Sequence, residues 1–318
     1  MYQDFYNLRE RPFDLVPNPR YLFFTVKHRE ALSNLQYGIA GRRGITLLVG
    51  EAGTGKTTLV RAALQSEELK GARCLYLNNP TLTRSEFVEF LAAGFSLSSQ
   101  AAASKSTLLA ELERELIARQ AHGIVTALVV DEAQALPLEL LEEIRLLANI
   151  ETNTEKLLPV VLAGQPQLAD RLNDPNLKQL KQRVALRCDL QPLTLKETIA
   201  YISRRARIAG GDATKLFTRD AIELIHHCAR GIPRTISAVC DNALITGFAA
   251  ARKPVDWEIA REVCRDFDLD PPERRLEPTA AAAVEARTHV DGSVVPETPP
   301  VPGDLLFNWV NRRRFSFF

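Results

Sequence analysis

The sequence predicts a three-layer α/β domain with a parallel five-stranded sheet, followed by an all-helical domain. Two observations lead to this prediction. Five short apolar segments alternate with helical patterns before Pro192, which is typical of a parallel sheet covered by helices on both faces. After Pro192 the strand pattern ends, and the periodic segments that follow are helical.

The strand candidates are short runs of aliphatic and β-branched residues, at 45–49, 73–77, 124–130, 158–163 and 185–190. The segments between them carry apolar residues at helical spacing. They predict helices over 56–65, 84–95 and 106–119, and a helix with Pro137 in its first turn that runs to about Ile150.

The second domain is predicted to contain four helices, over 194–209, 218–229, 233–250 and 255–267. Thr194 and Glu197 have the spacing of a capping box, in which each side chain bonds a backbone N–H group of the other. Thr218 stands at an equivalent helix start, but Ala221 gives it no acid to complete the box.

Composition divides the chain further. Seven of the 18 prolines fall in residues 271–318, beside an alanine tract at 280–283. We therefore expect an N-terminal segment and helix over 1–44, the α/β domain over 45–192, the helical domain over 193–268 and a flexible Pro/Ala-rich linker over 269–303. Residues 304–318 combine aromatic and aliphatic residues with three arginines, which favours a docking peptide for a partner, for the chain itself or for an anionic membrane surface.

Charge and cysteine content narrow the class of protein. Lys and Arg number 40 and Asp and Glu 39, so the chain is not basic all over, as a protein that coats nucleic acid would be. The five cysteines form no CxxC pair, which argues against a zinc site and favours buried thiols in a reducing cytoplasm. No apolar run approaches the roughly 18 residues of a membrane span, and the first five residues (MYQDF) do not begin a signal peptide.

One motif directly predicts chemistry. Residues 50–57 fit G-x-x-x-x-G-K-[ST], between a strand and a helix. Such a loop turns backbone N–H groups toward phosphate oxygens at a helix N-terminus. We expect Lys56 to bind the β and γ phosphates and Thr57 to bind Mg²⁺. The residues expected to hold ATP are Gly50, Glu51, Ala52, Gly53, Thr54, Gly55, Lys56, Thr57 and Thr58.

Two acids follow the third predicted strand. Asp131 is expected to bind Mg²⁺, and Glu132 to orient and deprotonate the attacking water, which is typical of P-loop enzymes that hydrolyse ATP. Asn78 and Asn79 end the second predicted strand. One of them can restrain Glu132, or both can simply form the turn before Pro80.

Three further polar sites have a functional and a plainer interpretation. Gln165 can contact the γ-phosphate or the water, or be an ordinary loop residue before Pro166. Arg183 can reach the γ-phosphate of a neighbouring subunit, as can Arg187, or each can be a surface arginine. Arg234 can project over the phosphates or simply follow the helix start at Pro233.

Taken together, these motifs resemble an AAA+ ATPase of the Orc/Cdc6-like type. The general secretion pathway protein A (ExeA-type) family is a closer resemblance over about residues 1–268. The residues that carry it are 5–8 (FYNL), 12–13 (PF), 17–19 (PNP), 22–23 (LF), 28–32 (HREAL), 37–39 (YGI), 131–134 (DEAQ) and 162–168 (LAGQPQL).

The resemblance implies a sensor role for Gln165 and Arg234, an arginine finger at Arg183 and a homo-oligomer driven by ATP. It also implies assembly of an outer-membrane secretin through a membrane-spanning segment and a peptidoglycan-binding domain. We recognise neither a membrane-spanning segment nor a peptidoglycan-binding domain in this sequence, so the implied contact with the cell wall is not carried over to it.

Two main functions compete, and the acid at Glu132 argues against a third, a nucleotide-gated switch that hardly hydrolyses ATP. The first is an ATPase that assembles or remodels a secretion, pilus or polysaccharide-export apparatus, in the cytoplasm or peripherally at the inner membrane. The second is a DNA-binding ATPase of the transposition-helper type, for which the arginines at 204, 205 and 207 give some support. A solvated helix face explains the same arginines.

Overall fold

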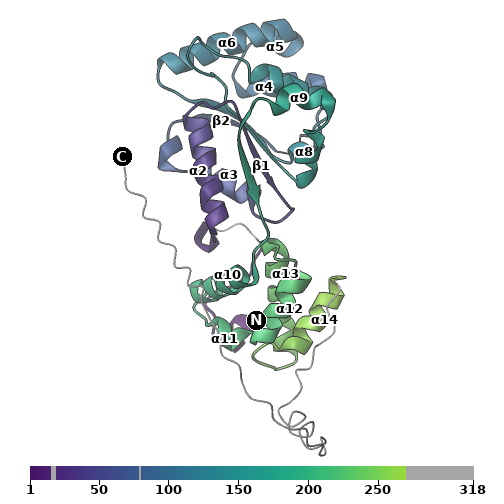
Figure 1. Ribbon diagram of the computed structural model, residues 1–318. Helices are drawn as coiled ribbons and strands as arrows, with labels where there is room; N and C mark the ends of the chain where they lie inside the picture. Colours follow the sequence, from purple (N-terminus) through teal and green to yellow (C-terminus); the bar gives the residue numbers. More distant parts are fainter. Residues whose placement is uncertain (16–18, 79, 270–318) are drawn as a thin grey trace, which may run out of the picture. The chain divides into compact units, whose positions relative to one another are not determined.

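Five parallel strands form one sheet in the order β2-β3-β4-β1-β5. The computed structural model describes residues 1–15, 19–78 and 80–269, and Figure 1 draws their elements with labels on most of them. The strands are β1 (Ile45–Gly50), β2 (Arg73–Leu77), β3 (Thr126–Val130), β4 (Val160–Gly164) and β5 (Val184–Leu190). All five predicted strands are confirmed, with ends that shift by up to two residues.

Helices cover both faces of the sheet, because successive strand residues point to opposite sides. Leu128 and Val130 of β3 belong to one apolar core, and Ala127 and Val129 to the other. The first core includes α4 (Arg84–Gly94), α6 (Lys105–Ala121), α7 (Leu138–Leu147), α8 (Pro166–Arg171) and α9 (Lys178–Lys181). The second includes α2 (Val26–Ala40) and α3 (Lys56–Leu64), which lie together on one side of the sheet in Figure 1.

The predicted helices of this domain are confirmed, with one correction. Pro137 is the N-cap of α7 and lies before its first turn. The sequence pattern did not predict the short helices α5 (Ser99–Ala103), α8 and α9, which have four to six residues each. Four 3₁₀ turns were also missed: Pro19–Tyr21, Glu67–Leu69, Ala133–Ala135 and Pro175–Leu177. Elements this short do not repeat an apolar period often enough to be recognised.

The helical domain contains the four predicted helices: α10 (Leu195–Ile208), α12 (Arg219–Cys228), α13 (Pro233–Ala249) and α14 (Trp257–Asp266), with the short α11 (Ala213–Leu216) after α10. The capping box of Thr194 and Glu197 is present, and Thr218 caps α12 alone, as predicted. Pro233 begins α13.

The N-terminal segment contributes to the core of the helical domain. Helix α1 (Tyr2–Tyr6) buries both of its terminal tyrosines there, and Phe13 packs edge-on against Phe217 with ring centroids 5.8 Å apart. Residues 1–44 therefore contribute to both domains, because α1 packs in the helical domain whereas α2 packs on the sheet.

Several expectations concern other parts of the chain. The predicted linker beyond residue 269 and the 304–318 peptide lie outside the described residues, as do Pro17 and Asn18 of the PNP motif. Within the described part, no helix combines the length and the apolarity needed to cross a bilayer. All five cysteines lie in the described part and none forms a disulfide, and all but the half-buried Cys74 are buried. Burial raises the pKa of the Cys74 thiol to about 11.

We expect Phe13→Ala to destabilise the protein by about 3–5 kcal/mol, because the side chain is fully buried and its loss leaves a cavity. Urea unfolding followed by circular dichroism measures this change. Val26→Ala is the control, since Val26 is 69% exposed. Equal losses for the two variants would contradict the placement of Phe13 in the core.

Candidate functional site

The loop between β1 and α3 has the backbone of a phosphate-binding loop. Gly53 and Gly55 have φ values of +83° and +100°, which residues with a Cβ rarely adopt. A Cβ on Gly50 would lie 3.0 Å from the carbonyl oxygen of Leu190 in the neighbouring strand. The Thr54 hydroxyl donates to the Glu51 carbonyl at 2.8 Å, which closes the loop on itself.

Lys56 folds back over this loop. Its side chain is buried, and Nζ donates to the carbonyl oxygens of Gly50 at 2.8 Å and Glu51 at 3.1 Å. Burial lowers the pKa of Lys56, although the carboxylates of Glu132, Asp131 and Glu51 oppose this shift. The ammonium has only uncharged acceptors in the loop, so an anion placed there would supply a counter-charge.

Asp131 is held at the end of β3 by three donors. Its Oδ2 accepts hydrogen bonds from the Thr57 and Tyr76 hydroxyls, each at 2.7 Å, and its Oδ1 accepts from the Glu132 N–H at 2.9 Å. Burial and the bond to Asp131 raise the pKa of Tyr76. The structure thus brings together the two residues predicted to bind Mg²⁺. Tyr76 was missed because a tyrosine within a strand carries no motif.

Glu132 is held by two side-chain amides. Its Oε2 accepts from Gln134 Nε2 at 2.6 Å and from Gln165 Nε2 at 3.4 Å. Gln165 thus lies beside Glu132, while its predicted contact with the γ-phosphate or the water stays a prediction. Gln134 was not singled out from the sequence. Asn78 is exposed, and no hydrogen bond joins it to Glu132 in the described part of the chain. Asn79 lies outside the described residues.

Arg234 approaches the loop from the helical domain. Its backbone N–H donates to the Gly53 carbonyl at 3.3 Å, and a Cβ on Gly53 would lie 2.9 Å from the Cβ of Arg234. Gly231, three residues before Arg234, packs closely on the Leu193 backbone, since a Cβ there would lie 2.2 Å from the Leu193 carbonyl oxygen.

Arg205 corrects the prediction of a solvated arginine face on α10. Its side chain is only 9% exposed, and it donates to the carbonyl oxygens of Pro12 at 2.6 Å and Asp14 at 3.0 Å. Its guanidinium also lies 4.8 Å from the ring centre of Tyr21 and donates to the Tyr201 hydroxyl at 2.8 Å. Arg205 therefore ties the N-terminal segment to the helical domain.

His28 is a second link that the sequence analysis did not recognise as a site residue. It is buried at the start of α2, where Nδ1 lies 2.8 Å from the Thr25 hydroxyl and Nε2 lies 3.1 Å from the Thr54 carbonyl oxygen. The residues before β1 thus help to fix the loop.

A cavity of about 490 Å³ lies over the loop, within the usual size of a small-molecule site. Its lining includes Lys56, Thr57, Thr58, Glu132 and Arg234. A hollow of about 130 Å³ with more apolar walls adjoins Gly55 and is lined by aromatic side chains that include Tyr21, Phe23 and Tyr201.

Arg183 and Arg187 do not line either space. Arg183 precedes β5, whose first residue pairs with Ile45 at the start of β1, while Leu190 pairs with Gly50 at its end. The length of β1 therefore separates Arg183 from the loop, roughly 17–20 Å at about 3.3 Å per residue. Arg187 forms an exposed ion pair with Asp189 at 3.1 Å.

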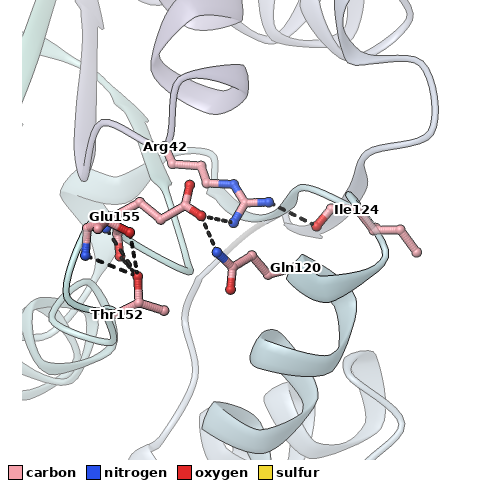
Figure 2. Close-up of polar contacts among 6 residues, drawn as sticks. Arg42, Gln120, Ile124, Thr152 and Glu155 are labelled. Carbon is pink, nitrogen blue, oxygen red and sulfur yellow. Dashed lines mark hydrogen bonds and ion pairs between the residues drawn. The ribbon is translucent and has the colours of Figure 1, made fainter.

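Hydrogen bonds and an ion pair connect the loops at the amino-terminal ends of the strands, where Arg183 lies. Arg42 pairs with Glu155 at 3.4 Å and donates to the Ile124 carbonyl at 3.4 Å, and Gln120 also donates to Glu155 (Figure 2). The Arg183 carbonyl accepts from the Ile45 N–H at 3.3 Å, which fixes its backbone beside β1.

Comparison with known proteins agrees with this geometry. Residues 39–172 match the model of an AAA domain family. The chain is also 41% identical over 249 residues to general secretion pathway protein A of Aeromonas hydrophila. This match covers 78% of the chain but only 45% of the relative, so the chain spans less than half the length of that protein.

Residues 39–172 therefore carry an AAA domain, and the chain is similar to general secretion pathway protein A.

Solved structures support the AAA fold of the chain. The Drosophila ORC bound to DNA matches with a TM-score of 0.59 at 20% identity, over 88% of this chain and 67% of that one. The Aeropyrum pernix ORC2 protein in its ADPNP–ADP complexes matches with a TM-score of 0.58 at 16% identity, over 86% and 74%. The AAA domain is a P-loop NTPase fold, which implies nucleotide binding.

We expect nucleotide binding to take up a proton at alkaline pH. Burial lowers the pKa of Lys56, so the free protein loses this proton below the ordinary lysine pKa of 10.5. A bound phosphate would restore the charged form. Calorimetric titration with ADP, in buffers of different ionisation enthalpy, should therefore show uptake that grows as pH approaches 10.5 from neutrality. Lys27→Met, at an exposed lysine, should keep this behaviour. Uptake that does not change with pH would contradict the prediction.

Proposed function

We propose that this protein is an Mg²⁺-dependent ATPase that drives assembly or remodelling of a cell-envelope secretion, pilus or polysaccharide-export apparatus. The observation that carries the enzymatic part is the meeting of Lys56, Thr57 and Glu132 on one cavity over a phosphate-binding loop. A phosphate-binding cation, a metal-binding hydroxyl and a carboxylate base are the groups that this hydrolysis needs.

The residues present fit a magnesium ion. Thr57 Oγ1 and Asp131 Oδ2 lie 2.7 Å apart, and oxygen atoms are the ligands that Mg²⁺ prefers. Thr57 and Asp131 would hold the ion, with water and phosphate oxygens as its further ligands. When bound, it would neutralise charge on the β and γ phosphates.

In the proposed reaction, water attacks the γ-phosphorus while the bond to the β–γ bridging oxygen breaks. Glu132 accepts the proton of the attacking water, and Lys56 stabilises the charge on the phosphate oxygens. Gln165 orients the water or the γ-phosphate from the end of β4. Arg234 contacts the phosphates from α13, so the helical domain responds to the nucleotide bound.

The aromatic hollow beside Gly55 supports a site for the adenine base. Its walls come from Tyr21 and Phe23 of the N-terminal segment and Tyr201 of α10, and aromatic rings stack well on bases. Arg205 holds two of these elements together, through Tyr21 and Tyr201.

The position of Arg183 supports a homo-oligomer. The residue precedes β5, a strand length from its own phosphate-binding loop, so as an arginine finger it would act on the site of another subunit. Arg187 is less suited to this role, because Asp189 already pairs with it.

The envelope role is supported by the similarity to general secretion pathway protein A. The alternative, a DNA-binding ATPase of the transposition-helper type, loses one argument, since Arg205 is buried and bonded within the protein. Anisotropy of a labelled duplex at near-physiological salt, with ATP and with ADP, separates the two functions. Binding that depends on ATP and is lost in Lys56→Ala would favour the alternative.

The principal test of hydrolysis is Glu132→Gln, which removes the proton acceptor and keeps the shape. We expect kcat to fall by roughly 10²–10⁴ while ATP still binds, because general bases contribute about that factor. Steady-state phosphate release and binding of a fluorescent ATP analogue measure the two effects. Glu139→Gln, at an exposed acid in the first turn of α7, is the matched control. Normal turnover by Glu132→Gln would show that another group is the base.

The shared site is tested by mixing two inactive variants. Arg183→Ala retains an intact phosphate-binding loop, and Lys56→Ala retains the arginine. We expect each to be inactive alone and mixtures to regain turnover, because one subunit then supplies what the other lacks. Arg187→Ala serves as the comparison and should remain active. Failure of every mixture to recover would argue against a finger that acts between subunits.

A further inference from the structure

We propose that Gln134 is a positioning residue that holds the carboxylate of Glu132 and links it to Gln165. This inference rests on the proposed function, because it assigns a role toward the proposed base. Gln134 lies in the 3₁₀ turn Ala133–Ala135 that follows the two acids after β3.

Both ends of the Gln134 amide are used. Nε2 donates to Glu132 Oε2 at 2.6 Å, and Oε1 accepts from the backbone N–H of Gln165 at 3.0 Å. The neighbouring groups determine the positions of the amide nitrogen and oxygen. A carboxylate can only accept and a backbone N–H can only donate, so the reverse orientation would break both bonds. A single side chain therefore joins the carboxyl ends of β3 and β4.

The structure fixes Gln134 from two further sides. The Arg171 guanidinium, on α8, donates to the backbone carbonyl oxygen of Gln134 at 2.5 Å. Gly164, at the end of β4, leaves space for the amide, since a Cβ there would lie 2.8 Å from Gln134 Oε1. The same Cβ would also lie 2.8 Å from Leu168. Gln134 is thus braced by its surroundings rather than free in solvent.

The backbone of Glu132 is fixed, but its side chain needs a partner to hold the carboxylate in place. Its φ of +52° and ψ of +36° are in the left-handed region, which non-glycine residues adopt rarely. The Glu132 N–H is bonded to Asp131, so the backbone is fixed while several side-chain torsions remain. Gln134 provides the short hydrogen bond to the carboxylate, and the bond from Gln165 Nε2 is longer at 3.4 Å.

Among the described residues, no hydrogen bond is made to Glu132 Oε1, so this oxygen remains available for proton transfer. Both amides donate to Oε2 of Glu132, and Glu132 lines the cavity over the phosphate-binding loop. Oε1 is then the acceptor for the proton of the attacking water. A displacement of about 1 Å at such a group can cost on the order of 10²-fold in rate. Losing Gln134 should therefore lower kcat, with little effect on nucleotide affinity.

The test compares Gln134→Met with Gln167→Met. Methionine has a similar length but no donor, and Gln167 is an exposed glutamine on α8. We expect Gln134→Met to lower kcat at least about tenfold, with KM and ADP affinity within about threefold of the parent protein. Arg171→Met should shift kcat in the same direction by less. Unchanged kcat in Gln134→Met, or an equal change in KM and ADP affinity, would overturn the inference.

Glu132→Gln separates this inference from the proposed function. Normal turnover by Glu132→Gln would mean that the base is wrong, whereas an inactive Glu132→Gln beside a normal Gln134→Met would refute only the role of Gln134. A double-mutant cycle with Gln134→Ala and Glu132→Ala needs no turnover. Their shifts in melting temperature should not add, because the two side chains contact each other. Additive shifts would overturn the inference even if the protein hydrolysed nothing.

Discussion

The parallel direction of all five strands is the constraint on which the site depends. Parallel strands place all their carboxyl ends at one edge, so the loop after β1, the acids after β3 and Gln165 after β4 meet there although they are far apart in sequence. The hydrogen bond from Thr57 to Asp131 at 2.7 Å joins two of these strand ends directly. The same constraint sends Arg183, which precedes a strand, to the opposite edge.

The carboxylates at this edge oppose the cost of burying a lysine. Lys56 is buried near Asp131 and Glu132, and its ammonium is bonded to backbone carbonyl groups. Desolvation disfavours the charged lysine, and the two carboxylates favour it. A phosphate group would enter between a cation that lacks a charged contact and carboxylates that already have hydrogen-bond donors.

The sequence was sufficient for the strands, the longer helices and the residues of the phosphate-binding loop, because each depends on a local period or a fixed spacing. Partners brought together by folding were not predictable. Tyr76 is an ordinary strand residue until the pairing of β2 with β3 places its hydroxyl on Asp131. Arg205 has the pattern of a surface arginine, but the N-terminal segment returns to the helical domain and covers it.

The proposed catalytic groups differ in whether they act within one chain or between two subunits. Glu132 is held within one chain, by Gln134 and by Gln165. Arg183 stands a strand length from its own loop and would act only across a subunit contact. Under the proposed function, assembly would then add a positive charge to a site whose base is already in place. Oligomerisation would control the rate through transition-state charge, with no rearrangement of β3 or β4 needed.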